Sequence, residues 1–458
     1  MSRVRAAMRK ESKQMKNRRC LIAPSMLTGL FLTCYLNGCS VLPRHWSYGS
    51  RDHAFIDYWP APPDSKQLRL AVKDNIDMKG TVTSAGSEYV IKHNPPASRD
   101  AACLAIARTR NVRIVGKTNL SEFAVAPSGL NDYFRTPKNP LNKRRKFIPG
   151  GSSSGSAVAV ANGSADVAFG TDTAGSIRVP SACCGVVGLK TTFGLISTKG
   201  VFPIEAKHLD TVGPIGKDVD HVVQGMDLLQ NGFAARYRTA VAAKPSAREI
   251  RIGRLYLSGT DPKIDEAVDK TLAQGQFEVT TLDQGFKAKW DQAKSDGNTV
   301  AAAGAWISDR DYLLKSGVRA RTIGVIVLGR VLYPAQYRQA LQRRRQWQHA
   351  LNQIFKKVDF IALPTLQSLP PTIPSIGNIA LLEARVLIMQ NTTAVNYAGN
   401  PALAIPIPVN DKIVPVTSLQ LVGPRMSEAA LLNVGHLIEA ERPQLDRLIM
   451  APKSPRTQ

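Results

Sequence analysis

The segment Pro149–Lys190 reads PGGSSSGSAVAVANGSADVAFGTDTAGSIRVPSACCGVVGLK and contains two glycine turns that each carry serine. Ser152 follows two glycines in the first turn, and Ser176 follows Gly175 in the second. Glycine lets the backbone adopt positive φ and approach a ligand closely, and consecutive free N–H groups can bind an anion. Flexible linkers are also rich in glycine and serine, but the residues between these turns are apolar. The segment therefore predicts a buried site that contains a nucleophilic serine and a second hydroxyl.

Three motifs, in this order along the chain, resemble those of the amidase signature family, whose members hydrolyse amides with a Ser–Ser–Lys triad. A lysine motif precedes the Gly-Gly-Ser-Ser turn, and a Gly-Thr-Asp turn that ends in Gly-Ser follows it. In this chain the three motifs are Val72–Asp77, Gly150–Ser153 and Gly170–Ser176. Similar residues continue over roughly residues 65–440. They include Val115–Asn119, Glu122–Phe123, Cys184–Lys190 and Asn400–Leu403.

The resemblance implies that Ser176 is the nucleophile, that Ser152 relays its proton and that Lys73 is the base. These residue types suit the reaction, because a serine hydroxyl is a weak nucleophile until a base removes its proton. Lys73 ends a predicted apolar strand, where burial would lower its pKa. The developing oxyanion also needs donors. We expect them from the backbone of the turn before Ser176, at Thr173, Ala174 and Gly175.

Two further implications concern the turns themselves. The resemblance implies a cis peptide bond between Gly151 and Ser152. Ser154 and Ala174 stand where many relatives have glycine, and both changes are small enough for activity to be retained. They narrow the space expected near the oxyanion but do not identify the substrate.

Helices alternate with short apolar strands along the chain, which is typical of an α/β layered fold. The predicted strands include Gln67–Val72, Asp166–Gly170 and Ile250–Leu257, and a small-residue helix is expected at Gly155–Asn162. With 458 residues, of which 43% are hydrophobic and 21% charged, the chain can form a large core. No shift in composition divides it, which favours a single large domain. The resemblance implies a mixed central β-sheet covered by helices on both faces.

The first 38 residues resemble a lipoprotein-type signal peptide. A basic segment precedes the uncharged apolar run Leu21–Tyr35, and the run leads to Leu-Asn-Gly-Cys at residues 36–39. We therefore predict lipidation of Cys39 and a membrane-anchored lipoprotein of the cell envelope that faces away from the cytoplasm. An uncleaved Leu21–Tyr35 anchor helix is the alternative. The predicted division is a signal peptide at 1–38, a tether at 39–64, an amidase domain at 65–445 and a C-terminal tail at 446–458.

The formal net charge of +25 raises the question of a nucleic-acid partner. The basic residues are scattered apart from Lys143–Lys146 and Arg343–Arg345, and no nucleic-acid motif accompanies them. We therefore predict no specific nucleic-acid partner and a small-molecule or peptide-like amide as substrate. No residues have metal-ligand spacing, so neither a metal nor another cofactor is expected. The remaining cysteines are predicted to be buried apolar residues, and they are Cys103, Cys183 and Cys184.

Three alternatives remain open. Gly151–Gly155 matches the Gly-x-Ser-x-Gly elbow of α/β-hydrolases, which would make Ser153 an esterase nucleophile with a histidine partner. The family also contains subunits of tRNA-dependent amidotransferases, although an exported leader argues against this activity because tRNA is cytoplasmic. The third alternative is a catalytically inactive lipoprotein that acts as a binding protein. Residues 245–350 resemble the family least, and we expect substrate selection there.

Overall fold

The structure, a computed structural model, describes residues 51–141, 146–374 and 379–441. The predicted signal peptide, Cys39 and the predicted C-terminal tail lie outside these residues. Only the last part of the predicted tether falls within them.

One 11-stranded sheet forms the centre of the described part of the chain. The strand order is β1-β3-β2-β4-β6-β5-β10-β11-β9-β7-β8. Strand β2 runs parallel to β3 and β4, whereas β4 and β6 are antiparallel, so the sheet is mixed as predicted. The bounds are β1 Phe55–Tyr58, β2 Leu68–Lys73, β3 Val112–Thr118, β4 Val167–Asp172, β5 Val187–Lys190, β6 Thr211–Gly216, β7 Arg251–Arg254, β8 Glu278–Thr281, β9 Phe360–Pro364, β10 Ala402–Pro408 and β11 Val416–Val422.

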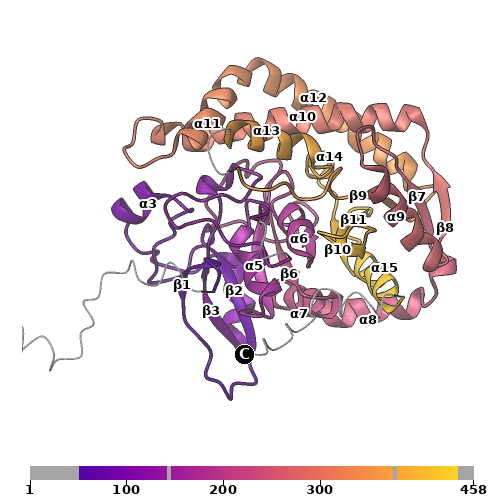
Figure 1. Ribbon diagram of the computed structural model, residues 1–458, viewed down its shortest axis with the longest axis horizontal. Coiled ribbons are helices and arrows are strands. Elements are labelled where there is room, and N and C mark those ends of the chain that lie inside the picture. The colour runs from indigo at the N-terminus through magenta and orange to yellow at the C-terminus, as the bar shows by residue number, and fades with distance from the viewer. Residues whose placement is uncertain (1–50, 142–145, 375–378, 442–458) are drawn as a thin grey trace, which may run out of the picture. The chain divides into compact units, whose positions relative to one another are not determined.

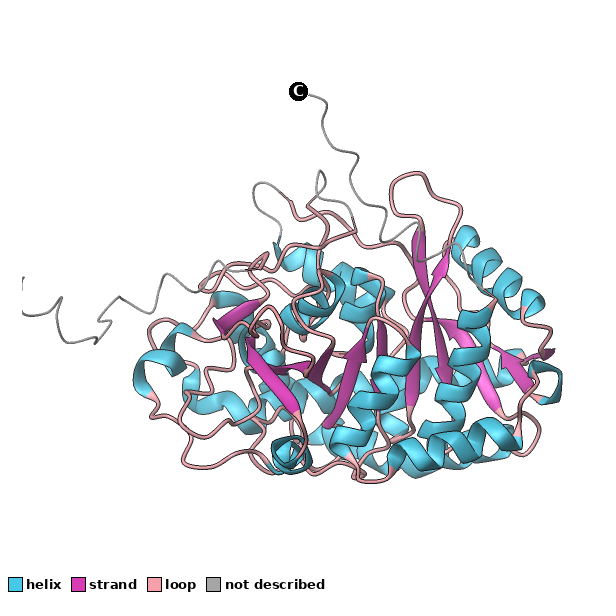
Figure 2. Cartoon of the chain, turned by 90° about the horizontal axis from the view of Figure 1, so that it is seen from below, coloured by secondary structure: helices cyan, strands magenta, loops and turns pink. Residues whose placement is uncertain are grey.

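Helices cover both faces of this sheet, which confirms the predicted fold class (Figure 2). In Figure 1 helices α10, α11, α12 and α13 lie together on one side, and α7, α8 and α15 lie on the opposite side. The bounds are α3 Glu88–His93, α4 Ala105–Thr109, α5 Ser154–Ala161, α6 Arg178–Cys184, α7 Val219–Leu229, α8 Phe233–Ala243, α9 Pro262–Gln274, α10 Gln284–Asp309, α11 Ala320–Leu332, α12 Ala335–Ile354, α13 Ile379–Met389, α14 Thr393–Ala398 and α15 Glu428–Ala440. Short 3-10 turns lie at Ala102–Leu104, Glu122–Ala124, Ala247–Glu249 and Arg310–Tyr312.

Helix α9 shows how the sequence determines an element. Asp261 accepts a hydrogen bond from the Lys263 N–H and caps the first turn, and Pro262 occupies the first helical position. The buried residues then follow with helical spacing, which turns one apolar stripe toward the core. They are Ile264, Ala267, Val268, Thr271 and Leu272.

Strand β1 corrects one predicted boundary, because it lies inside the segment predicted to be a tether. It pairs with β3 at the edge of the sheet, and Phe55 is fully buried. The folded part therefore begins before residue 65. A four-residue strand next to prolines is too short to show an alternating pattern, which is why the strand could not be predicted from the sequence.

The three cysteines lie where they were predicted, in the core. Cys103, Cys183 and Cys184 are free and buried. Burial raises the pKa of the Cys103 thiol to about 12, so this side chain stays a neutral apolar group at neutral pH.

Candidate active site

Lys73 is the last residue of β2, which lies between β3 and β4 in the sheet, and its side chain is fully buried. Its Nζ donates hydrogen bonds to Ser152 Oγ at 2.7 Å and to Thr171 Oγ1 at 2.8 Å. Burial lowers the pKa of Lys73 to about 7, although the Asp172 and Asp210 carboxylates favour the charged amine. A large fraction of the Lys73 amine is therefore neutral at physiological pH.

Ser152 lies in the glycine turn that precedes α5 and is fully buried beside Lys73. The Gly151–Ser152 peptide bond is cis, in agreement with the resemblance. The loop of residues 126–129 supports this turn, because the Gly151 N–H donates a hydrogen bond to the Pro127 carbonyl at 2.7 Å. A Cβ at Gly151 would lie 2.5 Å from the Ala126 carbonyl oxygen, so the turn and the loop of residues 126–129 fit together only with glycine here.

Ser176 is half-buried in the second turn, just before α6, and lines a cavity of about 1140 Å³. The two serine turns are joined by a hydrogen bond of 3.1 Å from the Ser153 N–H to the Ser176 carbonyl. In the described residues the Ser176 hydroxyl makes no hydrogen bond to Ser152. The structure thus brings the predicted nucleophile to the cavity wall and the Lys73–Ser152 pair to the adjacent buried turn.

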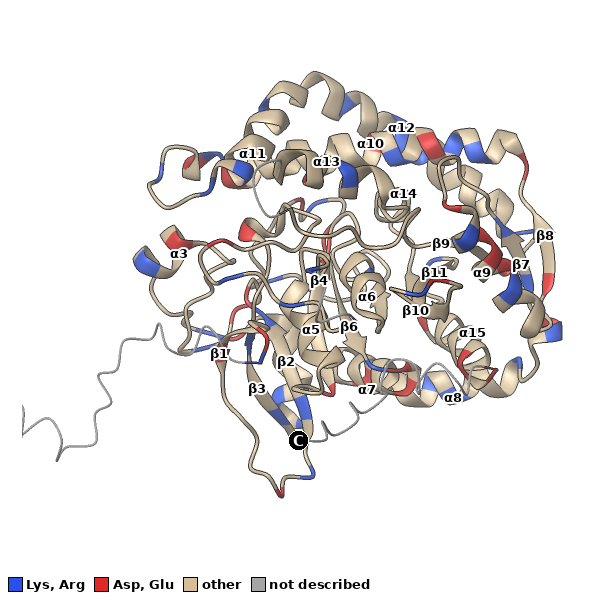
Figure 3. Ribbon diagram, viewed as in Figure 1, with Lys and Arg blue, Asp and Glu red and all other residues tan. Residues whose placement is uncertain are grey.

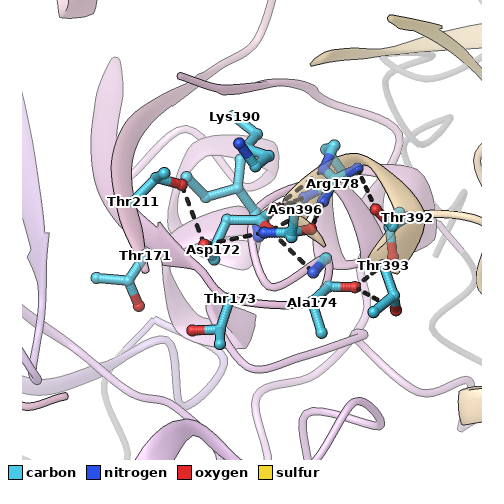
Figure 4. A network of polar contacts seen from close by, with 12 residues as sticks. Thr171, Asp172, Thr173, Ala174, Arg178, Lys190, Thr211, Thr392, Thr393 and Asn396 are labelled. Atoms are coloured by element: carbon cyan, nitrogen blue, oxygen red, sulfur yellow. Dashed lines mark hydrogen bonds and ion pairs between the residues drawn. The ribbon is translucent and has the colours of Figure 1, made fainter. Parts of the chain in front are cut away.

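A buried ion pair fixes the second turn (Figure 4). Arg178, the first residue of α6, contacts Asp172 at the end of β4 at 2.9 Å, and both side chains are fully buried. The Asp172 carboxylate also accepts hydrogen bonds from the backbone N–H groups of Gly175 at 2.8 Å and Ile177 at 3.0 Å. Burial alone opposes ionisation of Asp172, but Arg178 and the other nearby donors outweigh it and hold the pKa of this carboxyl below its ordinary value. Arg178 also donates to Gln420, Asn396 and the Thr392 carbonyl.

The predicted oxyanion donors differ in their surroundings. The Gly175 N–H already donates to Asp172, so this glycine supports the turn. Its φ is +138°, and a Cβ there would lie 2.2 Å from Thr392 Oγ1, so only glycine fits. Thr173 and Ala174 line the cavity together with Ser176. Thr173 and Ala174 therefore line the cavity beside Ser176, whereas Gly175 is buried and does not line it.

Replacing Arg178 with methionine is expected to lower the free energy of unfolding by about 3–5 kcal/mol, because it leaves the buried Asp172 carboxylate without its counter-ion. Urea denaturation measures this change. Arg108→Met is the matched control, because Arg108 contacts Asp100 at 2.9 Å with side-chain exposures of 40% and 27%. A surface pair of this kind contributes about 0–1 kcal/mol. Equal losses in the two variants would contradict the structural role of the buried pair.

The alternative esterase elbow does not have its required setting. Ser153 is fully buried, its hydroxyl donates to the Thr171 carbonyl at 3.3 Å, and it does not line the cavity. Among the described residues no strand leads directly into the turn, and no histidine hydrogen-bonds to Ser153. Nothing in this geometry therefore favours Ser153 as a nucleophile.

The far wall of the cavity comes from helices α10, α11 and α13, which the motifs of the sequence do not define. Substrate selection was expected within residues 245–350, and α10 and α11 lie there, but α13 lies beyond this range. The small-residue run Val300–Ala305 within the 26-residue α10 is a signal that could have pointed to this wall. Within the part of the chain that the structure describes, no cluster of three or more His, Cys, Asp or Glu side chains could hold a metal ion.

Comparison with known proteins gives a family match and many relatives. The family model described as Amidase matches residues 68–283 and 292–432. A glutamyl-tRNA(Gln) amidotransferase subunit from Halobacterium salinarum is 32% identical over 411 residues, covering 81% of this chain and 94% of the relative. The corresponding subunit from Clostridium acetobutylicum is 30% identical over 414 residues, covering 82% of this chain and 85% of the relative.

These relatives contradict the predicted location, a membrane-anchored lipoprotein of the cell envelope that faces away from the cytoplasm. That prediction treated export as evidence against a tRNA amidotransferase, yet proteins of that name match most of this chain. Within residues 51–141, 146–374 and 379–441, no helix is both long and apolar enough to cross a membrane. The match to these relatives shows that the predicted location is wrong. The prediction had rested only on the order of basic and apolar residues before Cys39.

Solved structures agree with the family match. The chain resembles 6-aminohexanoate cyclic dimer hydrolase with a TM-score of 0.76 and 20% identity, covering 89% of this chain and 94% of that chain. It resembles a bacterial aryl acylamidase with a TM-score of 0.72 and 19% identity, covering 85% of each chain. At these identities the likeness concerns the fold. Together with the extent of the family match, it shows that the chain belongs to the amidase signature family, whose enzymes hydrolyse amide C–N bonds.

Proposed function

We propose that this amidase hydrolyses its substrate through Ser176 as nucleophile, Ser152 as proton relay and Lys73 as base. The observation that carries the proposal is the 2.7 Å hydrogen bond between the buried Lys73 Nζ and Ser152 Oγ, in the turn that is bonded to the Ser176 backbone. Neutral Lys73 can accept a proton without a carboxylate or histidine partner. This arrangement is a Ser–Lys variant of the catalytic triad.

In the first step the Ser176 Oγ attacks the carbonyl carbon while its proton passes to Ser152 and the Ser152 proton passes to Lys73. The oxyanion accepts hydrogen bonds from backbone N–H groups of the turn that contains Thr173 and Ala174. The C–N bond then breaks as the proton returns through Ser152 to the leaving nitrogen, which leaves an acyl-enzyme on Ser176. Water hydrolyses this ester by the same proton path, releasing the acid and restoring Lys73 as a neutral amine.

Activity is expected to rise with pH through about 7 and to level off above it, because the neutral form of Lys73 is the active form and its pKa is about 7. Below this pKa, kcat/KM should fall about tenfold for each pH unit. Initial rates between pH 5 and 9 in buffers of constant ionic strength measure the profile. A basic limb that lies near pH 10, as for an exposed lysine, would contradict the proposed base.

Labelling with a serine-reactive fluorophosphonate tests the proposal directly. The probe is expected to modify one serine, and digestion followed by mass spectrometry should place the label on the peptide that contains Ser176. A label on Ser153 would favour the esterase alternative. Absence of labelling would favour an inactive binding protein.

A second candidate is the activity in the name of the curated relatives, that of a glutamyl-tRNA(Gln) amidotransferase subunit. It is favoured by the 32% identity over 411 residues to the Halobacterium salinarum protein. Binding of a small-molecule or peptide-like amide at Ser176 is the first candidate, and the second differs from it in having glutamyl-tRNA(Gln) as a partner. For the first candidate alone, we predict that the protein has no specific nucleic-acid partner.

A further inference from the structure

We propose that the substrate is a large, uncharged and mainly apolar amide, with its apolar part held between α10, α11 and α13. This inference rests on the proposed function, because it assigns the cavity at Ser176 to the substrate. Three properties of the cavity carry it, namely its size, the composition of its wall and the pairing of its charged side chains.

The cavity is large for a small amide. Its volume of about 1140 Å³ exceeds the roughly 300–1,000 Å³ typical of sites for drug-sized ligands. A substrate with only a few carbon atoms would leave most of the wall in contact with water. Binding free energy comes mainly from the apolar area removed from water, so the cavity is suited to a substrate with an extended apolar part.

The wall is built mostly from alkyl side chains. Helix α10 contributes three alanines, together with the polar side chains of Ser295, Asn298 and Thr299. Helices α11 and α13 contribute larger apolar residues and few charged ones, and most of their length is uncharged in Figure 3. The apolar lining residues of these helices are Ala301, Ala302, Ala305, Ala320, Val325, Leu328, Leu332, Ile379, Ala380, Ala384 and Leu387.

The cavity also has an apolar mouth. Leu328 of α11 is 49% exposed and Leu387 of α13 is 39% exposed, although both line the cavity. Their position at the boundary between cavity and solvent means that a chain longer than the cavity can continue outward along apolar side chains. A polar substrate would gain nothing from these contacts.

Charged side chains in the cavity wall are already paired with other protein groups. Arg321 contacts Asp132 at 2.5 Å and Glu383 at 3.5 Å. The Glu383 carboxylate also accepts hydrogen bonds from the backbone N–H and the hydroxyl of Ser128. Arg319, the second arginine of the wall, contacts Glu88 at 2.7 Å through one terminal nitrogen, whereas its buried Nε makes no hydrogen bond in the described residues. A substrate carboxylate or ammonium would have to break one of these pairs or be buried without a partner, and both are costly. The paired charges therefore favour an uncharged substrate.

A series of 4-nitroanilides with one leaving group tests this inference in the full chain. The acyl groups are acetyl, octanoyl and γ-glutamyl, the last of which carries an ammonium and a carboxylate. We expect kcat/KM for the octanoyl compound to exceed that of the acetyl compound by about tenfold or more, because each buried methylene adds to binding. It should exceed that of the γ-glutamyl compound by about a hundredfold. A γ-glutamyl or acetyl value equal to the octanoyl value would overturn the inference.

A pair of variants on α11 localises the effect. Leu328 lines the cavity, whereas Val331, on the same helix and 71% exposed, does not. Leu328→Asp should reduce the octanoyl-to-acetyl ratio of kcat/KM to about threefold or less, mainly through a higher KM, and Val331→Asp should leave the ratio within about twofold of the wild-type value. An unchanged ratio in Leu328→Asp would overturn the placement of the apolar group.

Failure of the inference and failure of the proposed function give different results. If the proposed function is wrong, Ser176 is not labelled by the fluorophosphonate, whatever the rates with the three anilides. If only the inference is wrong, Ser176 is labelled and the γ-glutamyl or acetyl compound is hydrolysed at least as well as the octanoyl compound.

Discussion

Replacing Ser176 with alanine is expected to reduce kcat by about 10⁴-fold or more and to abolish labelling by the fluorophosphonate. Removal of a nucleophile eliminates the covalent pathway and leaves only the contribution of oxyanion binding and substrate positioning. Ser176 is half-buried and lines the cavity, so the change should have little effect on stability. Steady-state rates, labelling and a thermal unfolding curve of the variant measure all three expectations.

Ser153→Ala is the matched control, because it removes a hydroxyl from the neighbouring turn. The Ser153 hydroxyl donates to the Thr171 carbonyl, so its loss disturbs the turn and lowers the rate while labelling of Ser176 persists. Persistent labelling in Ser176→Ala, with the label on Ser153, would refute the assignment of the nucleophile.

Replacing Lys73 with methionine has the second largest expected effect, a decrease of about 10³-fold in kcat/KM. General base catalysis contributes roughly 10²–10⁴-fold, and methionine retains much of the buried volume without an amine. Two hydroxyls, those of Ser152 and Thr171, lose their hydrogen-bond partner at Nζ. The remaining activity should no longer follow the basic limb near pH 7, which separates loss of the base from a purely structural defect.

Two histidines provide the controls for this prediction. His221 lies in α7, where its ring contacts Asp218, and His436 lies in α15. His221→Ala and His436→Ala are expected to change kcat/KM by less than about threefold, because neither histidine lines the cavity. A loss from either variant that matches the loss from Lys73→Met would support a histidine-dependent mechanism.

The sequence predicts those helices and strands whose residues form a clear local pattern of apolar or small side chains. Strand β2 is an apolar run that ends at Lys73, α5 is a continuous run of small residues, and β4 is buried along its whole length. Each of these elements carries one motif of the family, so the positions of Lys73, Ser152 and Ser176 could be predicted together with the elements that hold them.

The remaining features depend on contacts between distant segments. The pairing of the Gly175 N–H with Asp172 depends on how the turn folds around a buried carboxylate, which spacing does not show. Helices α11 and α13 are apolar on several sides, so their periodicity does not indicate which residues face the cavity. The error in location arose because it was predicted only from the order of basic and apolar residues before Cys39, which is a local pattern.

The position of β10 and β11 has a consequence for biosynthesis. These last strands lie inside the sheet, where β10 pairs with β5 and β11 pairs with β9. A nascent chain therefore cannot join its first six strands to β7–β9 until Val422 has left the ribosome. Arg178 likewise lacks its contacts with Asn396 and Gln420 until then. Because pairings between distant strands form slowly, a partly synthesised chain carries exposed strand edges, and these edges are prone to aggregation until β10 and β11 have paired.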